Sequence, residues 1–157
     1  MLDQDISLQL QERVVDARQM GTSLCIRGGG SKDFYGREAK GEPLEVGPHQ
    51  GIVNYEPTEL VITARAGTSL REVEAVLAAE RQLLAFEPPH FGDRATLGGT
   101  IGCNLSGPRR AYAGAARDFV LGTRVLNGRG EILAFGGEVM KNVAGYDVSR
   151  LMCGALG

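Results

Sequence analysis

The sequence predicts an α+β domain with two lobes, and two observations carry this prediction. The first part of the chain arranges strand-like apolar segments and a helix in a βαβ-like order. The second part holds two short strands joined by a tight turn, which indicates antiparallel pairing. The 157 residues suffice for one domain or two small lobes. We therefore expect a first lobe at about residues 1–66 and a second at about 67–157.

The first lobe begins with an expected helix over residues 4–20. Its apolar positions recur on one face (Ile6, Leu10, Val14 and Ala17), and Gly21 is a natural stop. Short strands follow, separated by the loop-like stretch "SKDFYGREAKGEP" and the turn "EPTE". We expect these strands at residues 23–27, 52–55 and 60–65.

The second lobe starts with a helix in "GTSLREVEAVLAAE". Ser69 is the expected N-cap, and Glu72 three residues later completes a capping box. The apolar face is formed by Leu70, Val73, Val76 and Leu77. Residues 87–118 show little regular pattern. The expected hairpin pairs residues 119–126 with 131–135 through the turn "NGRG", and residues 138–153 look mixed and partly helical.

Composition excludes several classes of function. The formal net charge is −2 and no basic stripe is present, which argues against nucleic-acid binding. No apolar run is long enough for a transmembrane helix, and the N-terminus does not resemble a signal peptide. We expect Cys25, Cys103 and Cys153 to be buried, reduced thiols of a cytoplasmic protein. The two histidines, His49 and His90, lack the spacing of metal ligands, so no metal site is expected.

The glycine triplet of "IRGGGSK" follows directly after a predicted strand. Glycine costs backbone entropy on folding, so the triplet must serve either a positive φ or a close approach to the bare backbone. The sequence fits neither a Walker A loop nor a dinucleotide-binding GxGxxG fingerprint. Taken alone, the triplet is explained equally well by a structural turn and by a binding loop.

A second glycine-rich segment, "ATLGGTIGCNLSG" at residues 95–107, favours binding. Leu97, Ile101 and Leu105 recur every four residues, which predicts a short helix despite the glycines. We expect its N-terminus to present free N–H groups to an anion. The alternative is tight packing of the helix against a sheet. Two such segments in one small domain indicate a shared diphosphate ligand.

Taken in order, "IRGGGSK", "TLGGTIGCNLSG", "KNVAGYD" and "LMCGALG" resemble the FAD-binding domain of the vanillyl-alcohol oxidase and p-cresol methylhydroxylase family. Within that family the stretch from "FEPPHFG" to "RDFVLG" is most similar to the FAD-binding subunits of bacterial glycolate oxidases. The resemblance covers nearly the whole chain. It implies a two-lobed FAD-binding domain of the p-cresol methylhydroxylase type, and it leads us to expect a substrate or cap domain beyond Gly157 in the family pattern.

The resemblance also implies which residues hold FAD. The triplet and Ser31 would line the diphosphate with their N–H groups, and Arg27 and Lys32 would flank it. The second segment would contact FAD through a larger set: Pro89, Thr96, Leu97, Gly98, Gly99, Ile101, Asn104, Ser106 and Gly107. The chain would pass along the isoalloxazine at Gly114, Ala116 and Asp118. For Asp118, hydrogen bonding to loop backbone is an equally good interpretation.

Two features qualify the implied chemistry. Some family members attach FAD through a histidine just after the triplet, and Ser31 occupies that position here, so we expect non-covalent FAD. Cys103 lies outside the family's cysteine-linking motif and is better explained by burial. No catalytic base can be named from the sequence: His90 is better explained as an exposed loop histidine. Lys141, Tyr146 and Asp147 are better explained by a helix start with Tyr146 packed inside than by a polar site.

The implied function is that of a subunit that oxidises a 2-hydroxy acid such as glycolate and passes electrons through FAD to a partner. Partners would include a catalytic flavoprotein subunit and an iron–sulfur subunit, because this chain holds no iron–sulfur ligand motif. The alternative is a non-catalytic, FAD-carrying or assembly subunit. A cell-wall-precursor reductase with the same fold finds no support here. We expect a cytoplasmic location, at the inner membrane through the partners, and no turnover by this chain alone.

The triplet suggests one substitution. We expect Gly29 to have a positive φ and Gly29→Val to lose FAD affinity more than stability.

Overall fold

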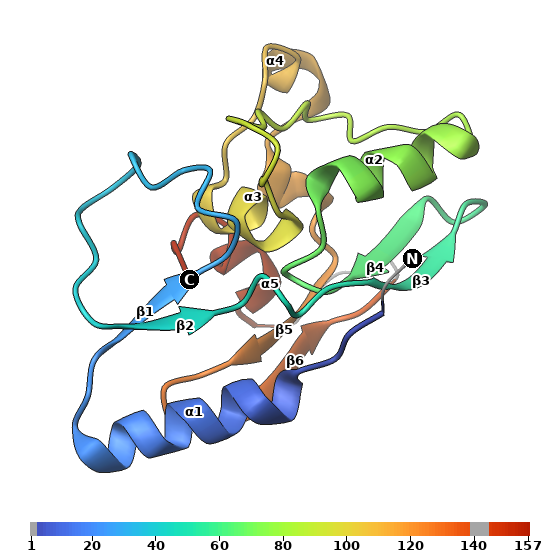
Figure 1. The fold of residues 1–157 in the computed structure, drawn as a ribbon. Helices are drawn as coiled ribbons and strands as arrows, with labels where there is room; N and C mark the ends of the chain where they lie inside the picture. The colour runs from blue at the N-terminus through green and yellow to red at the C-terminus, as the bar shows by residue number, and fades with distance from the viewer. Residues whose placement is uncertain (1–2, 139–144) are drawn as a thin grey trace.

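The computed structural model describes residues 3–138 and 145–157. It contains three small two-stranded sheets with helices around them, which confirms the α+β class (Figure 1). The helices are α1 (Ser7–Met20), α2 (Leu70–Ala79), α3 (Leu97–Cys103), α4 (Arg110–Ala113) and α5 (Val148–Leu151), with a 3₁₀ turn at Ala116–Phe119. None of the helices within these residues is long and apolar enough to cross a lipid bilayer.

The first sheet pairs β1 (Leu24–Arg27) with β2 (Glu42–Glu45) in parallel, from Leu24 opposite Glu42 to Arg27 opposite Glu45. A loop joins these strands, so the expected βαβ-like order is wrong. β2 was not predicted, because its first two residues, Glu42 and Pro43, look like the end of the polar loop. β1 therefore ends at the glycine triplet, and its neighbour ends beside it.

The other two sheets are antiparallel hairpins. β3 (Ile52–Glu56) pairs with β4 (Val61–Ala64), and β5 (Gly122–Leu126) pairs with β6 (Ile132–Gly136) through the predicted turn. Gly130 N donates to Asn127 O within that turn at 3.0 Å. Residues 116–119 form the 3₁₀ turn rather than the start of β5, so the strand is shorter than predicted.

The apolar faces of the two long helices are placed as expected. Val14 and Ala17 of α1 are buried, as is Ile6 just before the helix, and Gly21 ends the helix with a φ of +69°. In α2, Leu70 and Val73 are fully buried. The remaining buried apolar side chains are Leu44, Leu77, Phe86, Ala95, Ala115, Ala116 and Cys153. Figure 1 shows α3 in the middle of the molecule, between α2 and the loop that follows β1.

The predicted capping box of α2 is wrong. Ser69 is the N-cap residue, but its side chain makes no capping hydrogen bond. Instead the backbone bridges Ser69 to Thr96, and Leu70 N donates to Ala95 O at 2.9 Å. The start of α2 is thus stabilised by the segment that leads into α3.

Candidate FAD-binding site

Each of the three glycines after β1 is required for its own structural reason. Gly30 has a φ of +66°, where a side chain is strained, but Gly28 and Gly29 lie outside the left-handed region. A Cβ on Gly28 would lie 3.0 Å from Thr96 Oγ1, and one on Gly29 would overlap the carbonyl oxygen of Arg94. The positive φ expected at Gly29 is therefore wrong. Its backbone is approached closely by the protein itself.

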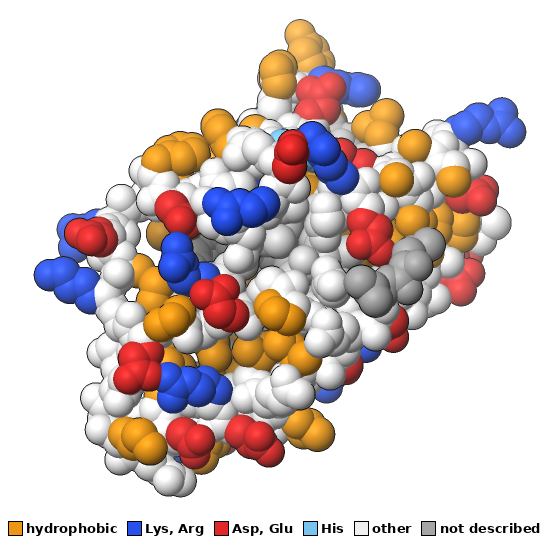
Figure 2. All heavy atoms as spheres, viewed as in Figure 1, with side chains coloured by type: hydrophobic (Ala, Val, Ile, Leu, Met, Phe, Trp, Pro, Cys, Tyr) orange, Lys and Arg blue, Asp and Glu red, His pale blue; other side chains and the backbone are white. Residues whose placement is uncertain are grey.

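The triplet borders a polar hollow of about 180 Å³. Two arginines and two carboxylates line it together with the glycines: Arg27, Gly28, Gly29, Gly30, Asp33, Glu45 and Arg94. Figure 2 shows one face of the molecule, where backbone and uncharged polar atoms cover the middle and hydrophobic, basic and acidic side chains surround them. Arg27 Nη2 and Asp33 Oδ2 are 3.3 Å apart, so one pair of opposite charges is already joined.

The N–H groups of this loop are open. Within residues 3–138 and 145–157, the N–H groups of Gly28, Gly29, Gly30 and Ser31 donate no hydrogen bond. Successive open N–H groups form a concave site that favours an anion. The hollow therefore fits a diphosphate held by backbone, although its four charged side chains cancel one another.

The N-terminus of α3 behaves in the opposite way, and the free N–H groups predicted there are not found. Leu97 N donates to Thr68 O at 2.9 Å, and Gly98 N donates to Ala66 O at 2.8 Å. Gly99 N donates to Thr96 Oγ1 at 3.2 Å, which makes Thr96 the N-cap. A Cβ on Gly98 would lie 2.7 Å from Ala66 Cβ. Tight packing explains these glycines better than an anion site.

The polar side chains after α3 support the neighbouring loop. Asn104 Oδ1 accepts from Arg117 N at 3.2 Å, and Ser106 Oγ accepts from Ala116 N at 3.0 Å. Asp118 Oδ2 accepts from Ala115 N at 2.8 Å, as expected for its backbone-bonding role. These predicted cofactor residues thus fix the course of the 114–118 segment.

The structure brings the two glycine segments into contact where Gly28 meets Thr96. Other predicted positions lie farther along the second segment. Gly107 packs against Glu87, and its N–H donates to Phe86 O at 2.8 Å. The remaining predicted positions in this part of the chain are half-buried: Pro89, Leu97, Gly99, Ile101 and Gly114.

Lys32 is buried beside the triplet, with 9% of its surface exposed. Its Nζ lies 3.5 Å from Ser31 Oγ. Burial lowers the pKa of Lys32, with a smaller opposing effect of Cys103. Burial raises the pKa of the Cys103 thiol. Cys103 and Cys25 are only partly buried, so the expected burial holds for Cys153 alone; all three are free thiols.

Neither histidine lies in the lining of the hollow. His90 is half-buried and its Nε2 lies 2.9 Å from Glu74 Oε2 of α2, so the expected exposed histidine is in fact tied to a carboxylate. Tyr146 is 92% exposed, which contradicts the expected inward packing. Asp147 caps α5 by accepting from Arg150 N at 3.1 Å, as the predicted helix start requires. Lys141 lies outside the described residues.

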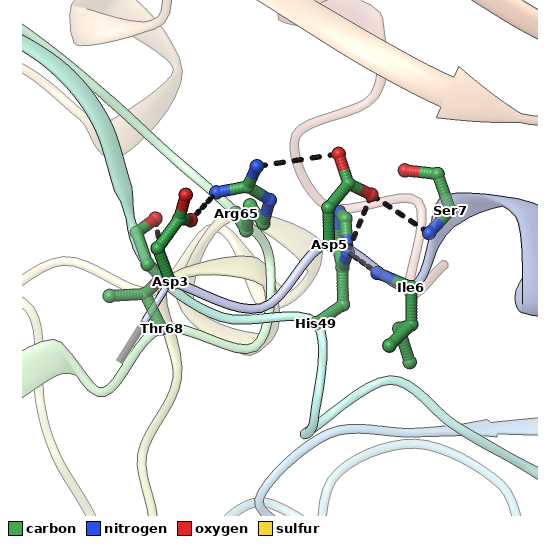
Figure 3. Close-up of polar contacts among 8 residues, drawn as sticks. Asp3, Asp5, Ile6, Ser7, His49, Arg65 and Thr68 are labelled. Atoms are coloured by element: carbon green, nitrogen blue, oxygen red, sulfur yellow. Dashed lines mark hydrogen bonds and ion pairs between the residues drawn. The ribbon is translucent and has the colours of Figure 1, made fainter. Parts of the chain in front are cut away.

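A polar cluster near the N-terminus was not foreseen (Figure 3). Arg65 pairs with Asp3 and Asp5, and His49 Nδ1 accepts from Ile6 N at 3.3 Å. His49 O accepts from Gly67 N at 2.7 Å, next to the carbonyl that receives the N-terminus of α3. Alternating aspartates at Asp3 and Asp5 were the only sequence signal, and nothing in the sequence identified Arg65 as their partner.

Comparison with known proteins agrees with this geometry. Residues 7–136 match the model of a family described as an FAD binding domain. The glycolate oxidase subunit GlcE of Escherichia coli is 57% identical over 98% of this chain, which spans 44% of that protein. The glycolate oxidase subunit GlcD of Bacillus subtilis and a D-lactate dehydrogenase of Archaeoglobus fulgidus are each 33% identical. The match to the first covers 89% of this chain and 28% of that protein, and the match to the second covers 90% of this chain and 32% of that protein.

A solved structure supports the fold. The crystal structure of Phl p 4, a grass pollen allergen with glucose dehydrogenase activity, matches with a TM-score of 0.69 over 82% of this chain and 27% of its own. At 16% identity it speaks for the fold alone. The family match covers most of the chain, and the open amide loop lies within it. The chain belongs to the FAD binding domain family.

Proposed function

We propose that this chain is the FAD-binding portion of a flavin-dependent 2-hydroxy-acid oxidase or dehydrogenase subunit. Its substrate would be glycolate or a similar acid, and its electrons would pass through FAD to a partner. The carrying observation has two parts: the N–H groups from Gly28 to Ser31 donate no hydrogen bond within the described residues, and Gly28, Gly29 and Gly30 line a polar hollow. Support for the substrate class comes from the similar glycolate oxidase subunits and D-lactate dehydrogenase.

The residues present fit the diphosphate of FAD. The amides from Gly28 to Ser31 would donate to its oxygens, while Arg27 and Lys32 would supply positive charge nearby. The segment from Thr96 to Gly107 would hold the rest of the cofactor beside the 114–118 loop. Bound FAD supplies the two-electron acceptor chemistry, and the chain supplies position and polarity. We propose non-covalent attachment, because Ser31 stands where the linking histidine of some family members would be.

The proposed arrangement places FAD between the lobes of residues 1–66 and 67–157. The contact between Gly28 and Thr96, one from each lobe, supports it. We propose a cytoplasmic protein that reaches the inner membrane through partner subunits, among them a catalytic flavoprotein and an iron–sulfur protein.

A second candidate function is that of an FAD-carrying or assembly subunit without its own turnover. It is favoured by the two histidines, because His90 is tied to Glu74 and His49 belongs to the N-terminal cluster. Among the described residues, neither is in the lining of the hollow. Anaerobic addition of glycolate separates the two functions. Bleaching of the visible flavin absorption in the purified protein alone supports turnover, and bleaching only with partner subunits present supports the carrier role.

The cofactor itself is tested by the absorption spectrum of the purified protein. We expect the bands of oxidised flavin, and we expect acid precipitation to release the yellow colour into the supernatant. A protein that shows no flavin bands and binds no added FAD would contradict the proposed function. Flavin that stays with the denatured chain would contradict only non-covalent attachment.

A further inference from the structure

Two side chains of opposite charge line the hollow without an ion-pair partner. Arg27 pairs with Asp33, but among residues 3–138 and 145–157 neither Arg94 nor Glu45 has an ion-pair or hydrogen-bond partner for its side chain. Both residues are exposed, so their charged groups can meet a ligand that arrives from solvent. The hollow therefore has one cation and one anion available for a ligand.

The first sheet fixes Glu45 beside the start of the triplet. Glu45 is the last residue of β2 and lies opposite Arg27, the last residue of β1. Val46 N donates to Arg27 O at 2.7 Å, which holds the ends of the two strands together. In dinucleotide-binding proteins of a different fold, an acidic residue that follows the phosphate loop by about 20 residues accepts from a ribose hydroxyl. Glu45 follows the triplet by a comparable stretch of chain.

The loop before α3 fixes Arg94 beside the same triplet. The carbonyl oxygen of Arg94 occupies the space that a Cβ on Gly29 would need. The preceding residue, Asp93, forms an ion pair with α2. The following residue, Ala95, is buried, and its carbonyl accepts from Leu70 N at 2.9 Å. The backbone that carries this guanidinium is therefore held to α2 on both sides.

The two available charges suit different parts of a ligand. The guanidinium and the unbonded N–H groups of the triplet attract a phosphate, whereas a carboxylate repels it. An ionised carboxylate only accepts hydrogen bonds, so it suits neutral groups that donate them, and neighbouring hydroxyls of a sugar can donate to both of its oxygens. A sugar joined directly to a phosphate carries the two kinds of group side by side. FAD has such a sugar on each side of its diphosphate, the ribose and the ribityl chain.

We infer that Glu45 makes the hollow specific for a sugar next to the diphosphate: its carboxylate accepts from the sugar hydroxyls, and Arg94 binds the adjoining phosphate. The inference rests on the proposed function, in which the ligand is FAD. Neither residue takes part in the flavin chemistry. The same arrangement disfavours a further phosphate on the sugar, because Glu45 repels it.

The test compares Glu45→Ala and Arg94→Met with the parent, in the purified protein freed of flavin. The probes are FAD, ADP, FMN and 2′,3′-dideoxy-ADP, which lacks both ribose hydroxyls, and calorimetric titration measures each affinity. If the hydroxyls are those of the ribose, Glu45→Ala weakens ADP about tenfold and leaves 2′,3′-dideoxy-ADP unchanged. If they are those of the ribityl chain, it weakens FMN instead and leaves ADP unchanged. Arg94→Met should weaken ADP and 2′,3′-dideoxy-ADP by the same factor, about tenfold.

Arg37→Met and Glu38→Ala, on the exposed loop between β1 and β2, are the matched controls and should bind every probe like the parent. Thermal unfolding without ligand should be nearly the same for all variants, because the side chains changed are exposed. Equal losses for ADP and 2′,3′-dideoxy-ADP in Glu45→Ala, or unchanged or tighter binding of both ADP and FMN, would overturn the role of Glu45 while the proposed function stands. A parent protein that binds no FAD would overturn both.

Discussion

Two glycine-rich segments of this chain look alike in sequence and differ in what their amides do. After β1, the N–H groups from Gly28 to Ser31 donate no hydrogen bond within the described residues, and the three glycines line a polar hollow. At the start of α3, the N–H groups of Leu97, Gly98 and Gly99 are already bonded within the protein. The first segment therefore has backbone donors left for a ligand, and the first three amides of α3 do not. A glycine-rich sequence indicates that another group approaches the backbone closely, but it does not show whether that group is a ligand or another part of the protein.

The difference has a physical origin in the neighbours of each segment. The 66–68 segment offers carbonyls to α3, and Gly98 allows the helix to approach close to Ala66. The triplet meets a hydroxyl and a carbonyl, Thr96 Oγ1 and Arg94 O, at positions where a side chain would be. The glycines of α3 therefore stabilise the packing of this helix. The loop after β1 is also closely packed, but its backbone N–H groups remain without a hydrogen-bond acceptor among the described residues.

The largest effect is expected for a substitution that disrupts the docking of α3 against the 66–68 segment. Gly98→Val adds a branched side chain where even a Cβ would lie 2.7 Å from Ala66 Cβ and 2.8 Å from Ala66 O. Overpacking of this kind costs about 1–3 kcal/mol and more when the backbone must move, so we expect about 3 kcal/mol less stability. Urea unfolding measures it. Gly128→Val, which meets nothing within 4 Å, is the control. A Gly98→Val protein as stable as the control would show that α3 is not docked as described.

The open side is tested by Gly30→Ala. At a φ of +66° a Cβ costs about 1–2 kcal/mol, and the nearest atom, Asp33 Oδ2 at 3.2 Å, belongs to a side chain that can move. The domain should therefore fold with a modest loss, while the changed loop weakens FAD binding by about tenfold through one misplaced amide. Fluorescence titration and thermal unfolding, performed together, separate these effects. Unchanged FAD affinity would mean that the loop is only a turn.

Gly29 is a poorer probe than the sequence suggested. Because its Cβ would overlap Arg94 O, a substitution there displaces the 91–94 loop as well as the amides. Any loss of FAD affinity in Gly29→Val would therefore mix packing with binding. Gly30 separates the two contributions better, because a Cβ there meets only the side chain of Asp33.

How far the sequence predicted this site depends on the range of the contacts. Patterns within one element succeeded: the apolar faces of α1 and α2, the stop at Gly21 and the hairpin turn at 127–130 are local features. The family was predicted correctly from the resemblance to known proteins. The predictions that failed concern partners from distant segments. At the start of α2, the backbone carbonyl of Ala95 accepts a hydrogen bond in place of the predicted Ser69 side chain. The first amides of α3 donate to the carbonyls of Ala66 and Thr68. A single sequence does not show which distant carbonyl will arrive at a free amide.

The cap of α3 provides a smaller test of the docked side. Thr96 Oγ1 accepts from Gly99 N at 3.2 Å, and Thr96 is 7% exposed. Thr96→Ala removes this acceptor and should cost about 1 kcal/mol, since loss of an N-cap costs about 0.5–2 kcal/mol. Thr96→Ser keeps the hydroxyl and should retain most of the stability. Chemical denaturation of both variants decides the matter. Equal losses in Thr96→Ala and Thr96→Ser would assign the effect to the methyl group and its packing.

The smallest expected effect concerns the polar cluster near the N-terminus. This cluster supports the docking of α3, because His49 O accepts from Gly67 N, next to the Ala66 carbonyl that accepts from α3. Burial lowers the pKa of His49 below its usual 6.5, with Asp5 opposing this and Arg65 adding to it. The unfolded chain therefore binds the proton first as the pH falls, and the stability contributed by neutral His49 is complete above about pH 6.5 and lost as the pH falls through the pKa of the folded state.

Hydrogen bonds from Ser7 lower the pKa of Asp5 well below 3.8, with Arg65 contributing, so its contribution is present above that value and lost only in stronger acid. Between about pH 7 and pH 5, His49 is thus the member of the cluster that should respond. We expect the free energy of unfolding of the parent to fall more steeply over this range than that of His49→Gln, measured by urea titration at each pH. The expected reason is local: a protonated ring can no longer accept from Ile6 N at Nδ1. Parallel pH profiles for the two proteins would show that the contact between His49 and Ile6 contributes nothing to the support of α3.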